Sequence, residues 1–218
     1  MGITDRRARH RASLRREILD AASKLFVEVG YDRVTMRRIA GLIEYSPTTI
    51  YLHFKNKQEL FDAVCDETFA QLGARLEKLK RTADTPIGYL REGLRTYVEF
   101  GTSHPDHYTV TFLQSPKGGD LSDFERSTGG RAFSLLRQAV RACVEHGDVK
   151  TPDVEMTAQA LWAAVHGLTA LLITAKGFPF VSRKALIDHS IDTLMAGLQG
   201  ASSAKRTAAQ SPPHSFMN

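Results

Sequence analysis

The sequence predicts an all-α fold, in which an N-terminal three-helix helix-turn-helix unit precedes a C-terminal helical bundle, about nine helices in total. Apolar residues recur at three- and four-residue intervals along most of the 218 residues, which is the spacing of one helix face. Capping residues, prolines and glycines divide these runs into segments of helical length. No segment shows the alternation typical of a strand, so helices alone are expected.

The first predicted helix carries a single apolar stripe. Its members follow one another every three or four residues: Leu14, Ile18, Ala22, Leu25, Phe26 and Val29. Gly30 follows as a left-handed C-cap. This pattern predicts a helix that packs against its neighbours and positions them.

A second helix is predicted from Met36 to Ile43. Thr35 suits its N-cap, because a threonine hydroxyl can accept a hydrogen bond from a backbone N–H of the first turn. The spacing turns the apolar residues of this helix toward the core and leaves Arg37 and Arg38 outside.

A third helix is predicted from Pro47 to Phe54, after a turn of two residues. Ser46 and Pro47 combine a capping residue with the imino acid favoured at the first helical position. Ile50 and Phe54 lie four apart and should anchor the helix inward. So short a turn inclines the third helix steeply to the second, which is the geometry that places a helix N-terminus in a major groove.

The outer face of the third helix and the charge of the chain both favour DNA binding. The residues left on or near that face are Pro47, Thr48, Thr49, Tyr51 and His53. Their hydroxyl and methyl groups can approach base edges, and the larger polar tips can reach phosphates. Residues 1–57 contain 12 Lys and Arg against 6 Asp and Glu, whereas the rest of the chain contains 17 against 18. A basic N-terminal segment on an otherwise nearly neutral chain favours binding to DNA phosphates through counterion release.

Basic residues also lie at both ends of the segment 1–57. Residues 1–14 are predicted to be a flexible arm that adds affinity by simple electrostatics or threads into a minor groove. At the other end, Asn56 and Glu59 form a capping-box-like start to a fourth helix. Lys57 lies in its first turn, where a cation and free backbone N–H groups would converge on a phosphate.

The segment Ile50 to Lys57, IYLHFKNK, followed by Glu59 and Leu60, resembles the DNA-binding domain of the TetR/AcrR family of bacterial transcriptional regulators. The resemblance covers residues 1 to 65. It implies groove contacts for Thr48, Thr49 and Tyr51, a second-helix contact for Arg37, a backbone contact for Thr35, and phosphate contacts for His53 and Lys57. The sequence departs from the family pattern at Glu44, where a turn glycine is usual, and at Leu52, where a second aromatic is common.

The rest of the chain is helical in pattern up to residue 199. Helices are predicted at Gln58–Arg81, Pro86–His104, Pro105–Leu113, Leu121–His146, Pro152–Thr174 and Ser182–Leu198, with a loop at residues 114–120. The helix from Pro152 to Thr174 has no continuous polar face, so it must be covered on most sides. The resemblance implies that the last two helices pair with their copies in a homodimer, whose two reading heads meet a palindromic operator.

A ligand pocket is predicted inside the bundle, where helical proteins hold such sites. Trp162, His166 and Gly167 resemble the Trp-His-Gly signature of one C-terminal subgroup of the family. The candidate lining residues are Tyr97, Phe100, His104, Tyr108, Phe112, Phe133, Trp162 and His166. The same aromatics could instead fill the core, and His166 could be a hydrogen-bonded core residue. The ligand, an unknown small-molecule effector, is not named by the sequence.

Several classes of function lack support in the sequence. Cys65 and Cys143 lie in helical apolar patterns and are expected to be reduced core residues. No complete zinc set, Ser-His-Asp grouping or Gly-rich phosphate loop is present, so neither metal, cofactor nor enzymatic activity is expected. The longest apolar run, residues 168–175, predicts no membrane span, and the N-terminus lacks the apolar run of a signal peptide. A cytoplasmic location follows.

The sequence therefore predicts a DNA-binding regulator, most simply a homodimeric repressor that an effector releases from its operator. The expected organisation is a basic arm (1–14), a helix-turn-helix DNA-binding domain (15–60), a helical ligand-binding and dimerisation domain (61–199) and a disordered tail (200–218). Two alternatives stay open: a DNA-binding regulator without an effector, constitutive or activating, and a helical haem-binding or catalytic protein that uses His166 or His104.

Overall fold

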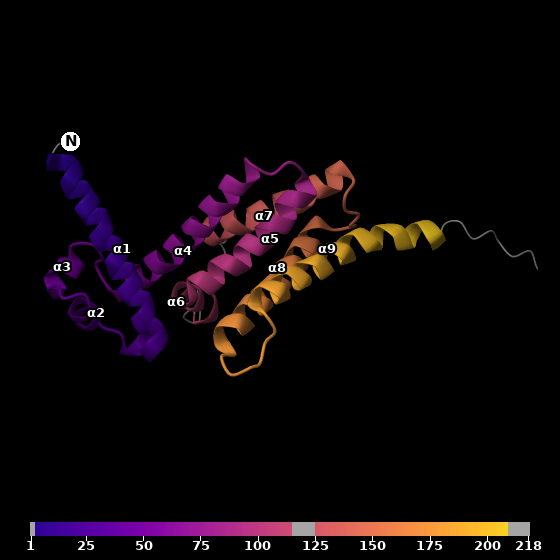
Figure 1. The fold of residues 1–218 in the computed structure, drawn as a ribbon. Coiled ribbons are helices and arrows are strands. Elements are labelled where there is room, and N and C mark those ends of the chain that lie inside the picture. Colours follow the sequence, from indigo (N-terminus) through magenta and orange to yellow (C-terminus); the bar gives the residue numbers. More distant parts are fainter. Residues whose placement is uncertain (1–2, 115–124, 209–218) are drawn as a thin grey trace, which may run out of the picture. The chain divides into compact units, whose positions relative to one another are not determined.

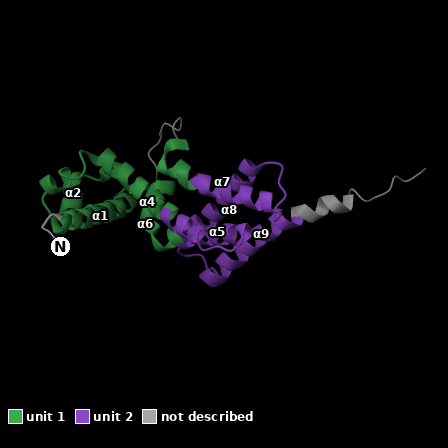
Figure 2. Ribbon diagram, turned by 90° about the horizontal axis from the view of Figure 1, so that it is seen from above, with its two compact units in different colours: residues 1–73, 100–132 green, residues 74–99, 133–218 purple. Residues whose placement is uncertain are grey.

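The structure is a computed structural model that describes residues 3–114 and 125–208 of the chain. Within these ranges it contains nine α-helices and no strand, which confirms the all-α fold class (Figure 1). The chain divides into two compact units, the first made of residues 1–73 and 100–132 and the second of residues 74–99 and 133–218 (Figure 2). The division differs from the boundary predicted after residue 60, because a later part of the chain returns to the first unit.

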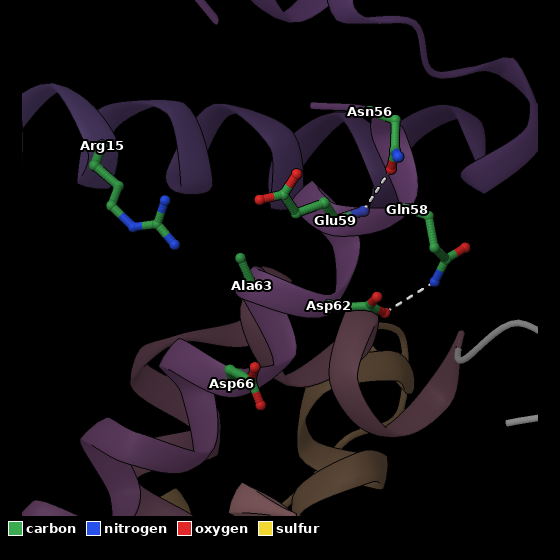
Figure 3. Close-up of a pocket in the computed structure, with 7 residues that line it drawn as sticks. All are labelled: Arg15, Asn56, Gln58, Glu59, Asp62, Ala63 and Asp66. Atoms are coloured by element: carbon green, nitrogen blue, oxygen red, sulfur yellow. Dashed lines mark hydrogen bonds between the residues drawn. The ribbon is translucent and has the colours of Figure 1, made fainter. Parts of the chain in front are cut away.

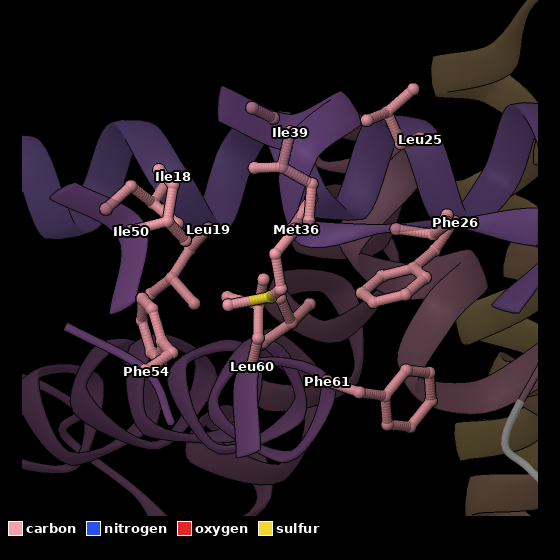
Figure 4. Packing of buried hydrophobic residues seen from close by; sticks show 14 of the residues in the cluster. Ile18, Leu19, Leu25, Phe26, Met36, Ile39, Ile50, Phe54, Leu60 and Phe61 are labelled. Carbon is pink, nitrogen blue, oxygen red and sulfur yellow. The ribbon is translucent and has the colours of Figure 1, made fainter. Parts of the chain in front are cut away.

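Unit 1 is built on one long helix and several short ones. Its elements are α1 (Ile3–Val29), the 3-10 turn η1 (Tyr31–Arg33), α2 (Met36–Leu42), α3 (Pro47–Tyr51), the first part of α4 (Lys57–Lys80), α6 (Pro105–Tyr108) and the π-helical turn η2 (Thr109–Leu113). The predicted stripe of α1 is buried in this unit up to Phe26, with Val29 partly buried, together with Met36, Ile39 and Ala40 of α2, Ile50 of α3 and Phe54 beyond it. Figure 4 shows Ile18, Ile50 and Phe54 gathered at one end of this core and the rings of Phe26 and Phe61 at the other.

Several boundaries in unit 1 differ from the prediction, among them the end of α6 at Tyr108, after which a π-helical turn runs to the predicted end at Leu113. α1 begins at Ile3, so most of the segment predicted to be a flexible arm is helical. α2 ends at Leu42 instead of Ile43, and α3 ends at Tyr51 instead of Phe54. Phe54 is nevertheless buried, because its backbone N–H still bonds to the Ile50 carbonyl oxygen at 3.0 Å and holds the ring against the core.

Each of the two turns on either side of α2 contains a residue with a positive φ, a glycine in one turn and a glutamate in the other. Gly30, after α1, has φ 79°, which costs a residue without a Cβ little. Glu44, between α2 and α3, has φ 59°, a left-handed conformation that is strained for any residue with a Cβ. The departure from the family's turn glycine therefore leaves the backbone geometry of the turn in place and adds a conformational cost.

Unit 2 consists of longer helices. They are the end of α4 (from residue 74), α5 (Pro86–Ser103, of which residues up to 99 belong here), α7 (Thr128–His146, from residue 133), α8 (Val154–Thr174) and α9 (Arg183–Ala208). Their buried residues form a second core that includes Leu90, Val140, Leu161 and Ile191. Arg91 and Arg95 of α5 pair with Asp192 and Asp188 of α9, which ties the two helices along one side.

Sequence boundaries in this part of the chain shift as well. α7 begins at Thr128, later than the predicted Leu121, and residues 115–124 lie outside the described ranges. α9 continues to Ala208, ten residues past the predicted end at Leu198 and into the segment predicted to be a disordered tail. The remainder of that tail, residues 209–218, lies outside the described part.

The most apolar helix, α8, is only partly covered within one chain. By length and composition it could cross a membrane, although it was not expected to from the length of its apolar run; core helices of soluble proteins have the same length and composition. Only 22% of its most apolar window is buried. Met156, Trp162 and Leu171 are exposed, with Leu171 at 53%. Met156 and Leu171 lie on one face of this helix, and exposed apolar side chains on a shared face are typical of a surface that a partner covers.

Candidate nucleic-acid interface

The helix-turn-helix pair is fixed at both starts by side-chain caps, as predicted. The Thr35 hydroxyl oxygen accepts a hydrogen bond from the Arg38 N–H at 3.2 Å. The Ser46 hydroxyl oxygen accepts one from the Thr49 N–H, also at 3.2 Å, and Pro47 occupies the first turn of α3. These caps satisfy backbone donors that would otherwise lack partners, so both short helices start at defined residues.

The predicted groove-facing residues lie mostly on the outside of unit 1. Pro47 and Thr48 are exposed, Tyr51 is 53% exposed, and Ile50 beside them is fully buried. Thr49 is half-buried, and its hydroxyl lies 2.9 Å from that of Ser46, so part of its hydrogen-bonding capacity is used within the helix start. α3 therefore presents a small, polar outer face on an apolar anchor, as base readout requires.

Leu52, the second departure from the family pattern, is 71% exposed, more than any other large apolar side chain in the described part of the chain. It sits at the C-cap of α3 beside Tyr51. The structure thus places an apolar side chain on the outer face where the family often has an aromatic ring. A leucine there can touch a thymine methyl group but cannot donate a hydrogen bond.

Arg37 and Thr35, the predicted contacts of α2, are exposed. Arg38 is exposed as well, and its guanidinium lies 3.5 Å from the Arg33 carbonyl oxygen, which turns it back toward η1. Of the two arginines of α2, Arg37 is thus the one the structure leaves for an outside contact.

His53 lies just beyond α3 in a positively charged setting. Burial lowers the pKa of its imidazole, and the nearby charges of Arg11 and Arg15 lower it further. The Arg15 guanidinium packs 4.4 Å from the centre of the Phe54 ring, and its Nη1 lies 3.5 Å from the His53 carbonyl oxygen. Sequence reasoning missed the contact of Arg15 with this site, because the two segments are far apart in the chain and no local pattern links them.

Lys57 has an intramolecular role that the sequence did not indicate. Its ammonium donates to the carbonyl oxygens of Tyr31 at 2.8 Å and Asp32 at 3.3 Å, and it lies 4.2 Å from the centre of the Tyr31 ring. The Tyr31 hydroxyl donates in turn to Gln58 at 2.7 Å. These contacts join η1 to the start of α4, so the cation predicted for a phosphate already serves two backbone carbonyls.

The predicted capping residues at the start of α4 are present. The Asn56 side chain accepts a hydrogen bond from the Glu59 N–H at 2.8 Å. The Glu59 carboxylate accepts one from the Lys55 N–H at 2.7 Å, one residue before the position that a capping box would use. The start of α4 is therefore fixed from both directions.

A shallow pocket of about 430 Å³ lies between α1 and the start of α4 (Figure 3). Its lining includes Arg15 and the three carboxylates of Glu59, Asp62 and Asp66. Carboxylates in this number repel phosphates, so this hollow is not part of a phosphate-binding surface. Arg15 is the only basic residue that lines it, and the acidic side chains of α4 make up most of its charged lining.

The predicted ligand residues divide between the two units. Four lie in unit 1: Phe100, His104, Tyr108 and Phe112. His104 stacks on Phe100 at 4.7 Å between ring centres, and its Nδ1 lies 3.0 Å from the Phe100 carbonyl oxygen. Tyr108 is buried and packs 4.7 Å from Phe112. In this unit the aromatics act at least in part as core, one of the two interpretations left open by the sequence.

The other four, Tyr97, Phe133, Trp162 and His166, meet in unit 2. The Trp162 indole N–H donates to the Tyr97 hydroxyl oxygen at 3.2 Å, and that hydroxyl lies 3.3 Å from His166 Nδ1. Burial lowers the pKa of His166. The neutral ring can therefore accept the Tyr97 proton at Nδ1, which directs one chain of hydrogen bonds from Trp162 to His166. Phe133 lies 6.0 Å from Trp162.

A further polar contact in unit 1 was not predicted. His107 of α6 lies 3.0 Å through its Nε2 from the Asp20 carboxylate of α1, and its Nδ1 lies 3.5 Å from the Thr68 hydroxyl of α4. One imidazole thus bridges three helices of the unit that carries the helix-turn-helix. No sequence signal identifies it, because its partners lie 39 and 87 residues away.

The thiols and the potential metal ligands give little support for catalytic or metal-binding chemistry. Cys65 and Cys143 are free, and burial raises the pKa of each thiol to about 11, so both are weakly nucleophilic. Among the described residues no group of three or more His, Cys, Asp and Glu side chains is arranged to hold a metal ion.

Comparisons with known proteins agree with this geometry. Residues 18–64 match the family model of bacterial regulatory proteins, tetR family, and residues 90–196 match that of the tetracyclin repressor-like C-terminal domain. The HTH-type transcriptional regulator YhgD of Bacillus subtilis is 30% identical over 154 residues, which cover 65% of this chain and 74% of the relative. The HTH-type transcriptional repressor NicS of Pseudomonas putida is 27% identical over 139 residues, covering 62% and 66%.

A solved structure gives the same fold. The transcriptional regulator FadR of Bacillus subtilis, in complex with stearoyl-CoA, superimposes with a TM-score of 0.72 at 21% identity, covering 83% of this chain and 97% of that one. The C-terminal match is to the tetracyclin repressor-like model, so the Trp-His-Gly subgroup stays a prediction from residues 162, 166 and 167.

Proposed function

The chain belongs to the TetR family of bacterial regulatory proteins and is a DNA-binding transcriptional regulator, and on that premise we propose that it is a homodimeric repressor released from a palindromic operator by a small-molecule effector. The observation that carries the proposal is the capped α2–α3 pair, whose outer face is exposed while its inner face is anchored in the core. The proposed location is the cytoplasm, where the DNA lies, and no catalytic role is assigned.

We assign base contacts to the exposed residues of α3, Thr48 and Tyr51, with Thr49 beside them. Pro47 sets the start of the helix, and its ring can pack against the sugar-phosphate backbone. Arg37, Thr35 and His53 surround α3 with groups that suit phosphates. Lys57 remains a candidate phosphate contact only through the donor that its two carbonyl partners leave over.

The homodimer is supported by the partly covered α8. A family resemblance implies pairing of the last two helices, and the exposed Met156 and Leu171 on one face of α8 are the kind of surface that such pairing buries. A dimer carries two copies of α3, and a two-fold axis between them matches a palindromic operator.

The effector is proposed to act in the C-terminal bundle. The FadR structure shows that this fold, in that protein, accommodates stearoyl-CoA, so acyl-CoA thioesters are a reasonable first probe. An effector can release DNA only by binding the non-binding conformation more tightly. The hydrogen-bonded chain of Trp162, Tyr97 and His166 offers polar groups that a ligand would have to reorganise.

The test begins with selection of preferred sites from random DNA by the purified protein. The proposal predicts a palindromic winner and a complex of two chains per site, measured by analytical ultracentrifugation of the bound probe. Addition of acyl-CoA thioesters of several chain lengths and a panel of small aromatic compounds should then lower the affinity for the site. If the protein selects an operator but no probe at saturation lowers its affinity for that site, the alternative of a regulator without an effector is favoured. If the protein selects no sequence, the proposal of a repressor is contradicted.

A further inference from the structure

α1 extends well beyond the core of unit 1. The helix begins at Ile3, yet residues 5–13 are all exposed, and the first buried residue after them is Leu14. Residues 5–13 contain four arginines and one aspartate. A charged extension that buries nothing gains no packing energy from its own chain, so its sequence and helical form indicate another role.

The arginines of this extension are not distributed evenly around the helix. Arg7 lies seven residues before Leu14, and Arg11 lies seven before Ile18, a spacing of two turns that keeps side chains on one face. Arg7, Arg11 and Arg15 also follow one another at intervals of four. They form a ridge that prolongs the buried face of α1 past the end of the core. Arg9 and Arg16, seven apart, lie on the opposite face.

The ridge leads directly to the DNA-contacting side of unit 1. Leu14 and Ile18 pack in the same core as Ile50 and Phe54, the two anchors of the third helix. One turn after Arg11, the Arg15 guanidinium covers the Phe54 ring at 4.4 Å. Arg11 and Arg15 also act on the pKa of His53, which places the charge of Arg11 near that ring. Arg7 is one turn further out along the same line.

We propose that the N-terminal extension of α1 is a second DNA-contacting element, in which Arg7 and Arg11 bind backbone phosphates beside the segment contacted by α3. The inference rests on the DNA-binding function of the chain. It replaces the flexible arm expected for residues 1–14, which would add affinity by simple electrostatics or thread into a minor groove. A preformed ridge loses less conformational entropy on binding than an arm that must be ordered.

The helical form also decides which part of the DNA is contacted. An α-helix with its side chains is roughly 10–12 Å across, whereas the minor groove of B-DNA is about 6 Å wide. A helical extension therefore cannot thread into that groove. Its arginines reach phosphates along the strand, where they fix the register of α3 without reading bases.

The experiment compares two double variants of the full chain that remove equal charge. One is Arg7→Ala with Arg11→Ala, on the ridge, and the other is Arg9→Ala with Arg16→Ala, on the opposite face. Alanine preserves helix propensity, and circular dichroism with a thermal melt checks that both variants fold like the parent chain. Affinity for the selected operator and for a scrambled duplex is measured by fluorescence anisotropy at several salt concentrations.

The ridge variant should bind about tenfold or more weakly at 0.1 M salt, and the slope of log K against log salt should fall by about 0.9 for each phosphate that the variant no longer neutralises. The opposite-face variant should change affinity by less than about threefold. Because binding to phosphates does not depend on sequence, the same difference is expected on scrambled DNA. It can therefore be judged even if selection of an operator fails.

Two outcomes would overturn the inference. Equal decreases in affinity for both double variants would mean that only net charge matters, and no decrease for either would mean that the extension stays off the DNA. A third variant tests the helical form itself. Ala12→Pro keeps every charge but interrupts the helix before the core, and it should reproduce the weaker binding of the ridge variant.

Discussion

In unit 1 the Leu, Ile and Phe side chains of α1 from Leu14 onward are buried within the chain, whereas in unit 2 the more apolar α8 leaves Met156, Trp162 and Leu171 exposed. The two helices differ in how much of their apolar surface their own chain covers. α1 is covered by α2, η1, α6 and η2 of its own chain and by residues of α3 and α4, and the Phe61 ring packs edge to face against Phe26 and Tyr31. α8 has no such cover within the described part of the chain, and in the proposed homodimer a second copy would provide it.

The largest effect is expected from Phe54, because its removal opens the closed core. Phe54→Ala should cost about 3–5 kcal/mol in unfolding free energy, measured by urea denaturation, since the ring is 1% exposed. Tyr51→Ala, three residues away and exposed, should change stability by less than about 0.5 kcal/mol while it weakens operator binding. Similar decreases in stability for the two variants would mean that α3 is not anchored as described.

A charge on the open face of α8 should act on assembly instead of on the core. Leu171→Glu should weaken self-association by roughly tenfold or more, because a carboxylate would be buried unpaired in the dimer. Sedimentation velocity over a concentration series measures this, with Arg141→Glu on exposed α7 as the matched surface control. An unchanged dimer in the Leu171 variant would show that α8 is covered by something other than its copy.

Lys57 sharpens the comparison within unit 1. Lys57→Met should lower the unfolding free energy by about 1–2 kcal/mol, because it removes a charged donor from the Tyr31 and Asp32 carbonyl oxygens. The neighbouring and exposed Lys55→Met should leave stability unchanged. If Lys57→Met instead kept full stability and lowered the slope of log K for DNA binding against log salt by about one unit, the phosphate contact predicted from the sequence would be supported.

Glu44 offers a gain in stability. Because its φ of 59° lies in the left-handed region, Glu44→Gly should raise the unfolding free energy by about 1 kcal/mol. The gain is smaller than the strain released, since glycine also adds freedom to the unfolded chain. A thermal melt detects the shift. A decrease in melting temperature would mean that the Glu44 side chain makes a stabilising contact that outweighs its backbone strain.

The histidines of both units predict the same pH trend by different routes. Burial lowers the pKa of His166 below its ordinary 6.5, and burial with two arginine charges lowers that of His53. The unfolded chain therefore binds more protons than the folded one as the pH falls below about 6.5, and stability should decline until the folded pKa values are passed. Urea denaturation at pH 7.5 and 5.5 measures the trend. His166→Gln should flatten it, and an unchanged slope in that variant would exclude His166 as a source.

Local signals in the sequence predicted the helix-turn-helix well. Thr35, Ser46 and Pro47 are capping and first-turn residues whose effect is confined to the next few residues, and the structure confirms both helix starts. The anchors Ile50 and Phe54 were found from spacing alone. The end of α3 was missed because no glycine or proline marks it, and the chain leaves the helix while Phe54 still reaches the core.

Features that depend on distant segments were not predictable in the same way. The charge run at residues 6–16 indicated affinity for DNA, but only the structure shows that it is helical and that Arg15 meets Phe54. Lys57 lies at a helix start, which suggested a phosphate, yet its partners come from a turn 25 and 26 residues earlier. The exposure of α8 is likewise invisible in a pattern that only shows it to be apolar.

The central claim is that the protein binds one palindromic DNA sequence as a two-fold dimer, in which each chain contacts bases through the exposed outer face of α3. Its most direct test is titration of the selected site and of a scrambled duplex with the purified chain, with the mass of the complex measured at saturation. We expect a palindromic site bound at least about a thousandfold more tightly than scrambled DNA, by two chains. Equal, weak binding to both duplexes by a single chain would contradict the claim.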